Sequence, residues 1–369
     1  MKIGIVTNLD KRNYGSVLQA YALKTKISEL GGECFFIDFT PGFKERLIRR
    51  VKNIFSPYRQ NYSLRTKWEL KKAKKFYWLK DQKLRNFCRN NFNIHEITNF
   101  KDAERQADQY NLLLAGSDQI WNPIAGLLSP FTLLSFANKN KQIKASYAAS
   151  LGVEQLNKKD IKIFSQYLID FKNISVRERT AVKILKECVP QKQIRVDLDP
   201  SLLFDIFFWK KKVIQSNYEN EPYIFVYMLR PDSLTIELAK KLSDKTTLKI
   251  KVCSNRIFNE HKMENITEAG IEDFLSLIYH SDYFITNSFH GSVFAVIFHK
   301  SFLSVAISRT GSRVRDFLVD LGLDEKIVTC ENELDRIFKK IPWDKVDEIV
   351  NQKRNESIDY IRKLIEGIR

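Results

Sequence analysis

The stretch Asp282-Tyr-Phe-Ile-Thr-Asn-Ser-Phe-His-Gly-Ser-Val-Phe-Ala-Val-Ile-Phe298 changes character twice along its length. It begins apolar and extended, turns through small polar residues from Thr286 to Ser288, and continues as an apolar run from Val293 to Phe298. This pattern predicts a strand, a tight loop and a buried helix. Ligands of open α/β sheets bind at the carboxyl ends of strands, where helix N-termini offer free N–H groups, so His290 is placed to meet an anion. The alternative is a histidine that caps a helix inside a packed core.

The same alternation of strand, loop and helix recurs on both sides of this stretch. Apolar runs predict further strands at Lys2–Thr7, Glu33–Asp38, Tyr110–Ala115, Ile143–Ser150, Ile174–Val176, Ile194–Leu198, Tyr223–Leu229, Leu248–Cys253 and Phe302–Ala306. Helical patterns lie at Gly15–Leu30, Lys158–Phe171, Ser233–Leu242, Gly270–Tyr279, Arg313–Leu321 and Lys345–Ile368. Repeated β–loop–α units imply a mostly parallel sheet. The loop after the first strand lacks the GxGxxG pattern, so neither NAD nor FAD is predicted.

A chain of 369 residues is too long for one ordinary core and predicts two domains. We expect an N-terminal Rossmann-like domain at 1–205 with a basic helical insertion at about 42–95. A C-terminal Rossmann-like domain follows at 222–340, since the polar segment from Asp205 to Pro222 lacks a sheet pattern. Residues 341–369 form a final helix that could pack back onto the first domain.

The spacing of the cysteines and the length of the apolar runs indicate the cellular compartment of the protein. The five cysteines are scattered and never form CxxC, which fits a reducing compartment and gives no zinc site or disulfide framework. The N-terminus indicates a strand rather than a signal peptide, and no apolar run approaches the ~20 residues that span a bilayer. We therefore expect a cytoplasmic protein.

The formal charge of +17 is concentrated in one segment. Between Lys44 and Phe92, sixteen Lys and Arg residues stand against three acidic ones. The part from Leu64 to Phe92 has a helical pattern with aromatic side chains among the lysines, which is typical of a membrane-surface element. The alternative is a helical insertion packed on its own domain with its lysines in water. No nucleic-acid-binding motif accompanies the charge, so nucleic acid is not predicted as a partner.

Four polar loops follow predicted strands: Asn13–Ser16, Gly116–Asn122, Arg177–Arg179 and Ser288–Ser292. Three come from the first half and one from the second, as expected of a site between two domains. The histidines outside these loops have no motif. No carboxylate or histidine pattern predicts a metal.

Individual residues in these loops suggest specific chemistry, each with a structural alternative. Arg177 suits a phosphate or carboxylate fork, or else a surface ion pair with Glu178. Asp118 is a candidate acid or base, or a turn former. Asn13 and Gly15 can hold an anion at a helix N-terminus, or simply cap it. Trp121 can stack on a sugar or pack in the core.

Taken together, the loops resemble the bacterial polysaccharide pyruvyl transferase family. The motifs, in order, are Asn13-Tyr-Gly-Ser-Val-Leu-Gln-Ala-Tyr-Ala-Leu23, Gly116-Ser-Asp-Gln-Ile-Trp-Asn122, Ser175-Val-Arg-Glu178, Asp199-Pro200 and Thr286-Asn-Ser-Phe-His-Gly291. The resemblance implies two Rossmann-like domains around a cleft, as in GT-B glycosyltransferases. It implies phosphoenolpyruvate as donor substrate, no bound cofactor, and a saccharide acceptor, most readily a lipid-linked or nascent surface polysaccharide. The product would be a cyclic pyruvate ketal, with phosphate released.

The resemblance assigns roles to residues of this chain. Arg177 matches a donor-binding arginine, and His290 matches the histidine of an Arg-x-His motif. The arginine of that motif would fall at Ser288, so a donor contact must come from elsewhere, with Arg309 and Arg313 as candidates. We predict His290, Arg177 and Asp118 as catalytic. The predicted substrate-binding residues are Asn13, Tyr14, Gly15, Ser16, Gly116, Ser117, Gln119, Trp121, Asn122, Asn287, Ser288, Gly291, Ser292, Arg309 and Arg313.

Two other functions remain open from the sequence. One is a glycosyltransferase of the same architecture that uses a nucleotide-sugar, for which Glu268 or Glu272 would bind the ribose. The other is a non-catalytic basic module that binds membrane or nucleic acid, which leaves the polar loops at strand ends unexplained.

Overall fold

The computed structural model describes residues 1–10, 12–39, 77–138, 140–214, 221–259, 263–306 and 311–367. Its N-terminal half (the described residues up to 214) is built on a parallel sheet in the order β3-β2-β1-β4-β5. The strands are β1 (Lys2–Val6), β2 (Glu33–Phe39), β3 (Ile94–Ile97), β4 (Leu112–Ala115) and β5 (Ile143–Ser146). This is the strand order of a Rossmann sheet, with its reversal between β1 and β4.

Two short strands extend this sheet beyond β5. β6 (Ile174–Val176) and β7 (Ile194–Val196) pair in parallel. Bridges from Ala145 to Asn173 and from Ala149 to Val176 connect β5 and its following loop to this pair. The loops after β6 and β7 therefore open on the same edge as those after β1 and β4.

The C-terminal half (described residues from 221 onward) repeats the design. Its parallel sheet has the order β10-β9-β8-β11-β12-β13. The strands are β8 (Tyr223–Met228), β9 (Lys249–Ser254), β10 (Met263–Asn265), β11 (Tyr283–Thr286), β12 (Ser301–Val305) and β13 (Ile327–Val328). Its central strand β8 is buried at every residue, as expected for a parallel strand covered on both faces. The reversal falls between β8 and β11.

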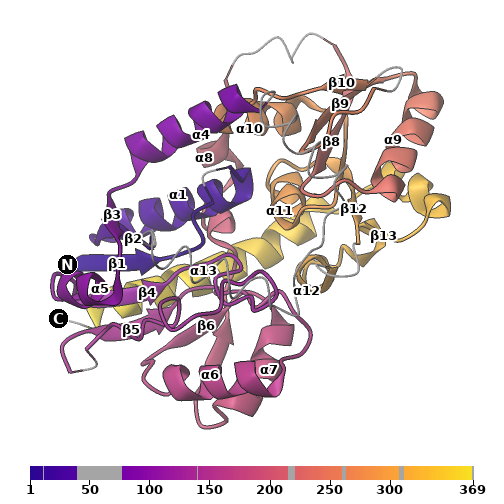
Figure 1. The fold of residues 1–369 in the computed structure, drawn as a ribbon. Coiled ribbons are helices and arrows are strands. Elements are labelled where there is room, and N and C mark those ends of the chain that lie inside the picture. Colours follow the sequence, from indigo (N-terminus) through magenta and orange to yellow (C-terminus); the bar gives the residue numbers. More distant parts are fainter. Residues whose placement is uncertain are drawn as a thin grey trace.

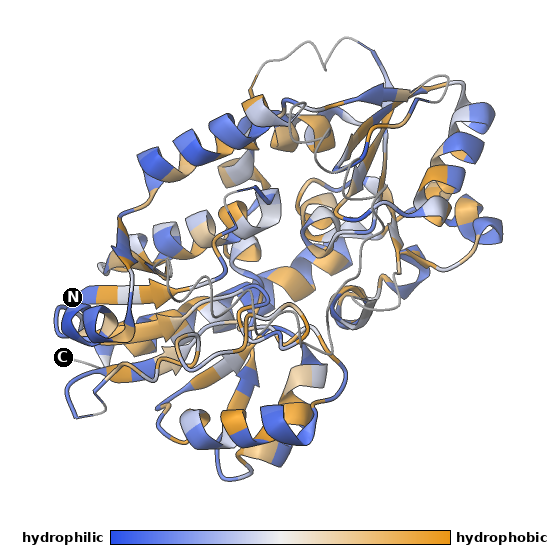
Figure 2. Ribbon diagram, in the orientation of Figure 1, coloured by the Kyte–Doolittle hydropathy of each residue, from blue (hydrophilic) through white to orange (hydrophobic). Residues whose placement is uncertain are grey.

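Helices cover both sheets (Figure 1). Those of the N-terminal half are α1 (Tyr14–Glu29), α4 (Trp78–Asn91), α5 (Phe100–Ala107), α6 (Lys158–Leu168), α7 (Arg179–Cys188), the 3-10 turn η1 (Pro200–Leu203) and α8 (Ile206–Lys210). Those of the C-terminal half are α9 (Ser233–Thr246), α10 (Ile271–His280), α11 (Phe289–Ile297), α12 (Gly311–Asp320), η3 (Asp324–Lys326), η4 (Glu331–Phe338) and α13 (Trp343–Glu366). Figure 2 shows the strands of both sheets largely in the hydrophobic colour, while α4 is mostly hydrophilic.

The final helix α13 runs from the C-terminal half back across the N-terminal half (Figure 1). Tyr360 donates a hydrogen bond to the carbonyl of Ser146 at the end of β5, and Ser357 accepts one from the N–H of Leu198. The side chain of Arg354 donates to the carbonyl of Leu202 at 2.6 Å. The described chain thus crosses between the halves twice, once near residue 214 and once through α13.

These observations confirm the predicted α/β class and parallel sheets and correct several details. The polar segment after Asp205 contains the helix α8, whose Trp209 is fully buried. The sequence analysis did not predict the short strands β3, β10 and β13. The predicted helix Leu64–Phe92 is described only from residue 77, so its first part lies outside the described residues. The proposed domain boundary at 205–222 stays a prediction.

Two further sequence predictions concern the compartment. Among the described residues, no helix is long and apolar enough to cross a membrane. All five cysteines are free, and four of them are buried.

Candidate functional site

The carboxyl ends of the central strands of the two sheets face one cavity. From the N-terminal half, Asn8 follows β1, and Asp118 and Gln119 follow β4. From the C-terminal half, Arg230 follows β8 and Asn287 follows β11. These are the strands between which each sheet reverses its order, the usual place for a ligand in such folds. The lining residues are Asn8, Asn13, Asp118, Gln119, Leu229, Arg230, Asn287, Ser288, Phe289, His290, Arg313 and Val314.

Two helix N-termini meet at this cavity. Asn13 caps α1 by accepting from the N–H of Gly15 at 3.0 Å, and Ser288 caps α11 by accepting from the N–H of Gly291 at 3.3 Å. The His290 ring lies directly against Gly15, because a Cβ added there would come within 2.2 Å of His290 Nδ1. Only glycine fits at this position.

Asp199 links His290 to Arg177. Its Oδ2 lies 3.3 Å from Nε2 of His290 and accepts a hydrogen bond from Nη1 of Arg177 at 2.8 Å. Burial by itself would raise the pKa of Asp199, but His290 and then Arg177 hold that pKa well below its usual range. Asp199 therefore stays ionised and is placed to orient the imidazole.

Arg177 is buried. The alternative role given to it from the sequence, a surface ion pair with Glu178, is therefore wrong. Its Nη2 lies 3.8 Å from Asp118 and its Nε lies 3.9 Å from Glu178, both too long for hydrogen bonds. Its guanidinium carbon stands 4.1 Å from the centre of the Phe289 ring. Nε and Nη2 have no hydrogen-bond partner in the structure. A buried donor without a partner is costly, so these atoms are suited to a ligand.

Arg313, on α12, brings a second buried guanidinium to the cavity. With the Gln119 amide oriented to satisfy the hydrogen bonds around it, its oxygen accepts from both Nη atoms of Arg313 at 2.9 Å. Nε of Arg313 has no partner. Burial, and then the charge of Arg177, lower the pKa of Arg313 to about 10. A bound anion would offset both the cost of burying the Arg313 charge and its repulsion by Arg177.

The predicted site residues divide into two groups. The cavity wall includes Asn13, Asp118, Gln119, Asn287, Ser288, His290 and Arg313, while Gly15, Arg177 and Gly291 lie directly behind it. Asp118 has a left-handed backbone (φ 65°) and accepts from the side chain of Asn8 at 3.0 Å. Arg309 lies outside the described residues.

Trp121 is the clearest correction. Its ring is fully buried between Phe164 and Phe171, and its Nε1–H donates to the carbonyl of Thr132. No face of the ring is left for a sugar.

The other predicted residues have structural contacts. Tyr14 is fully buried, stacks on Phe274 of the C-terminal half and donates to the carbonyl of Ala269. The Ser16 hydroxyl bonds the carbonyl of Asn8, and the Ser292 hydroxyl bonds Ser304. Gly116 packs against Thr7, whose hydroxyl donates to the carbonyl of Ser117, and the Asn122 side chain accepts from the N–H of Ala125.

The sequence places Asp199 in the Asp199-Pro200 motif without assigning it a role, and it does not single out Phe289. Asp199 follows a strand, as the residues of the four polar loops do, and this is the signal that points to it. Phe289 lies between two guanidinium groups, since Arg313 also approaches its ring, at 5.9 Å. Nothing in the apolar pattern around Phe289 distinguishes it from a core residue.

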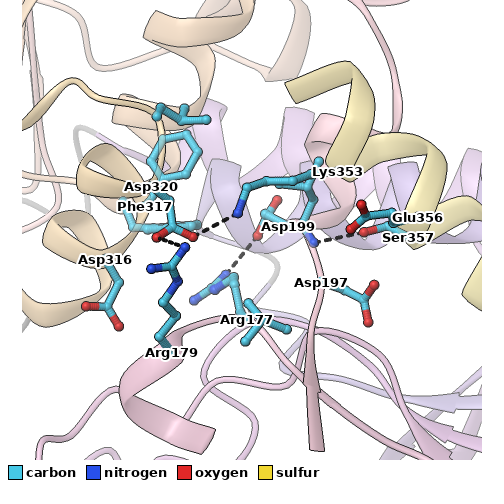
Figure 3. A pocket seen from close by; sticks show the side chains of 14 residues that line it. Arg177, Arg179, Asp197, Asp199, Asp316, Phe317, Asp320, Lys353, Glu356 and Ser357 are labelled. Atoms are coloured by element: carbon cyan, nitrogen blue, oxygen red, sulfur yellow. Dashed lines mark hydrogen bonds and ion pairs between the residues drawn. The ribbon is translucent and has the colours of Figure 1, made fainter. Parts of the chain in front are cut away.

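A second cavity, which shares Phe289 with the first, has Arg177 and Asp199 in its wall (Figure 3). It is lined by Arg177, Arg179, Val196, Asp197, Leu198, Asp199, Phe289, Asp316, Phe317, Asp320, Leu321, Lys353, Glu356 and Ser357. Most of its charges are paired within it: Asp320 binds both Arg179 at 2.9 Å and Lys353 at 3.0 Å.

The first cavity can bind a small anion and move a proton. Its buried cations are balanced by Asp118, Glu178 and Asp199, so binding relies on unpartnered N–H donors rather than on excess positive charge. His290 supplies a titratable group between a helix N-terminus and a carboxylate. Within the described part of the chain, no group of three or more His, Cys, Asp or Glu side chains is arranged to hold a metal ion.

Known structures share this architecture. The chain matches a putative UDP-N-acetylglucosamine 2-epimerase from Listeria monocytogenes (TM-score 0.54, 9% identity), covering 100% of this chain and 97% of that one. It also matches a UDP-N-acetylglucosamine 2-epimerase from Rickettsia bellii (TM-score 0.53, 10% identity, 98% of each chain). A third match is UDP-GlcNAc 2-epimerase from Neisseria meningitidis bound to UDP-GlcNAc (TM-score 0.50, 10% identity, 100% of this chain and 99% of that one). At this identity the likeness concerns the fold alone, which is of GT-B architecture.

The family follows from the sequence. The model of the polysaccharide pyruvyl transferase family matches residues 13–309, which is most of the chain, and the protein belongs to this family. It is therefore a transferase, which removes the alternative of a non-catalytic basic module. No curated protein matches the sequence closely enough to add a relative.

Proposed function

We propose that the protein transfers the pyruvyl group of phosphoenolpyruvate onto two hydroxyls of one sugar in a surface polysaccharide or its lipid-linked precursor. The observation that carries this proposal is the set of buried, unpartnered N–H donors of Arg177 and Arg313 beside His290, at the junction of the two halves. Phosphoenolpyruvate has two anionic groups, a carboxylate and a phosphate, and two guanidinium groups suit them. The reaction uses it as a substrate and needs no bound cofactor or metal.

His290 is the proposed proton donor. A proton added to the methylene carbon leaves a cation at the central carbon, to which the first sugar hydroxyl adds. The bond from that carbon to the phosphate oxygen then breaks, and the second hydroxyl closes the ketal. The proton of one sugar hydroxyl restores the proton that His290 gave to the methyl group. The proton of the other sugar hydroxyl leaves with phosphate.

The surrounding residues support these steps. Asp199, ionised and 3.3 Å from Nε2, stabilises the imidazolium form of His290. Asp118, on the cavity wall, is proposed to accept the proton of an attacking hydroxyl. The free N–H groups at the start of α1 and α11 add to the binding of the anion. Acid–base help of this kind is worth about 10²–10⁴-fold in rate.

The decisive assay measures phosphate released from phosphoenolpyruvate over a panel of glycans, with mass analysis of the glycan. We expect release that requires a particular saccharide and adds one pyruvyl group to it. If the protein instead releases a nucleoside diphosphate from a nucleotide-sugar and leaves phosphoenolpyruvate intact, it is a glycosyltransferase. No saccharide-dependent loss of phosphoenolpyruvate over a broad panel would contradict the proposal.

We further propose that the enzyme binds the anionic inner face of the plasma membrane through the Lys44–Phe92 segment. Most of that segment lies outside the described residues. Its described end is α4, where the Trp78 side chain is 62% exposed, while Lys80 is buried against Tyr14 and Lys83 pairs with Asp273. Sedimentation with phosphatidylserine vesicles at low salt should retain the protein, and high salt should release it. An absence of binding at low salt would remove this proposal.

A further inference from the structure

The helix α12 presents one polar face to the N-terminal half. Arg313, Asp316 and Asp320 are spaced by three and four residues, which places them on the same side of the helix. Val314, Leu318 and Leu321 are buried in the apolar core. An element of the C-terminal half is therefore fixed to its own core by apolar residues and to the N-terminal half by charged ones.

The helix α7 of the N-terminal half lacks a cap of its own. The residue at its N-cap position, Glu178, makes no capping hydrogen bond. Its Oε1 instead accepts from the Ser150 hydroxyl and from the N–H groups of Leu151 and Gly152. The first N–H groups of α7 therefore need another acceptor.

Asp316 supplies that acceptor from the other half of the molecule. Its Oδ2 accepts from the N–H of Thr180 at 3.0 Å and from the Thr180 hydroxyl at 2.9 Å. A carboxylate at a helix N-terminus also interacts favourably with the helix dipole. The cap that α7 lacks is thus provided by α12, across the junction.

This contact joins the two elements that carry the buried guanidinium groups. Arg177 lies directly before α7, and Arg313 lies one turn before Asp316 on α12. We propose that Asp316 is a positioning residue, which holds α12 against α7 and thereby sets Arg313 in the anion-binding cavity. Its effect on donor binding rests on the function proposed above.

The neighbouring ion pairs cannot take over this task. Asp320 bridges Arg179 of α7 and Lys353 of α13 (Figure 3). The Arg179 side chain is 64% exposed, so this pair is screened by water and salt. The contact of Asp316 is to a backbone N–H that has no side-chain cap from its own half, so it is more specific in geometry.

The first test uses steady-state kinetics with phosphoenolpyruvate. Asp316→Ala should raise KM for phosphoenolpyruvate about tenfold, the size typical for the loss of a charged helix cap, and change kcat much less. Asp316→Asn, which keeps an acceptor oxygen without the charge, should fall between Asp316→Ala and the parent. Asp335→Asn is the matched control, because Asp335 pairs with Lys245 on the surface of the same half.

A double-variant cycle tests whether Asp316 acts through Arg313. In an Arg313→Ala background, Asp316→Ala should add little to the change in KM, since the guanidinium that it positions is gone. If the double variant raises KM by the product of the two single-variant factors, the proposal is overturned. An Asp316→Ala variant that matches Asp335→Asn in KM would overturn it as well.

Hydrogen exchange provides a readout that does not depend on activity. In the full-length protein, Asp316→Ala should speed exchange of the Thr180 amide about tenfold relative to the parent, while Asp335→Asn leaves it unchanged. Unchanged exchange in the first turn of α7 would refute the cap. If the cap is confirmed and the parent protein does not consume phosphoenolpyruvate with any glycan, the proposed function fails and the cap between the halves stands.

Discussion

The two cavities beside the Arg177–Asp199 pair share the Phe289 side chain, but they differ in whether their charged groups have partners. In the cavity between α12 and α13, Asp320 binds Arg179 and Lys353, and Asp316 binds Thr180. In the cavity at the strand ends, Arg313 Nε has no hydrogen-bond partner. Groups that satisfy each other hold the halves together, whereas buried donors left unsatisfied are suited to a ligand. The comparison predicts that substitutions in the strand-end cavity mainly affect turnover. Loss of an ion pair in the cavity between α12 and α13 should mainly affect stability.

The largest effect is expected from His290→Ala. Loss of the proton donor should lower turnover about 10²–10⁴-fold, or roughly 3–5 kcal/mol in the barrier, while the thermal midpoint stays near that of the parent. His299→Ala is a matched control, because His299 also pairs with an aspartate, Asp347 at 2.9 Å, away from both cavities. Near-parental turnover of His290→Ala would remove the catalytic role.

Asp199→Asn should break the buried ion pairs that link Arg177 to His290. Arg177 would lose its counter-charge and His290 its ion-pair partner, and breaking such a buried pair typically costs about 3–5 kcal/mol of stability. Because the folded protein depresses the pKa of Asp199, its ionised form contributes stability above the pKa of an unfolded aspartate, about 3.9, and loses it as the pH falls through the folded value.

Thermal unfolding of both proteins between pH 3 and pH 7 tests this prediction. The variant should be less stable at pH 7 and should lose less stability than the parent on acidification. Equal stability at pH 7, or parallel pH profiles, would show that Asp199 is not the linking charge.

Gly15→Ala tests the contact between the two helix N-termini. The added methyl would fall within 2.2 Å of Nδ1 of His290, so the imidazole must move away from Asp199. A displacement of about 1 Å in a reacting group can cost around 10²-fold in kcat. The same substitution in a His290→Ala background should cost little more. A full additional loss there would mean that Gly15 acts on something other than His290.

The smallest effect is expected in the cavity with paired charges. Lys353→Met keeps the aliphatic stem but removes one partner of Asp320. The pair is partly exposed, with 29% of the Lys353 side chain accessible, and pairs screened by water contribute about 0–1 kcal/mol. The thermal midpoint should therefore fall slightly at low salt and match the parent at high salt. KM for phosphoenolpyruvate should change less than about twofold. A large rise in KM would show that the ion pairs of this cavity also affect phosphoenolpyruvate binding, which contradicts the difference predicted between the two cavities.

The sequence predicts the parts of this arrangement that depend on local pattern. Apolar runs mark the central strands, and polar residues after them mark the loops that meet at the strand ends, including His290 and Asp118. Short edge strands escape prediction: Met263–Asn265 has little apolar character and is defined by its pairing with β9. The role of Asp199 and the burial of Trp121 depend on contacts with distant parts of the chain, which no local pattern encodes.

The return of α13 has a consequence for the order in which the chain can fold during synthesis. Tyr360, Ile361 and Leu364 belong to the same apolar cluster as Tyr147 and Leu198, which precede them by more than a hundred and fifty residues. A ribosome releases the N-terminal half long before it makes these partners, and domains emerging early fold as units only when their cores are complete. The apolar cluster around Tyr147 is incomplete until the last helix is made, so a nascent chain stalled before α13 should expose apolar surface to chaperones.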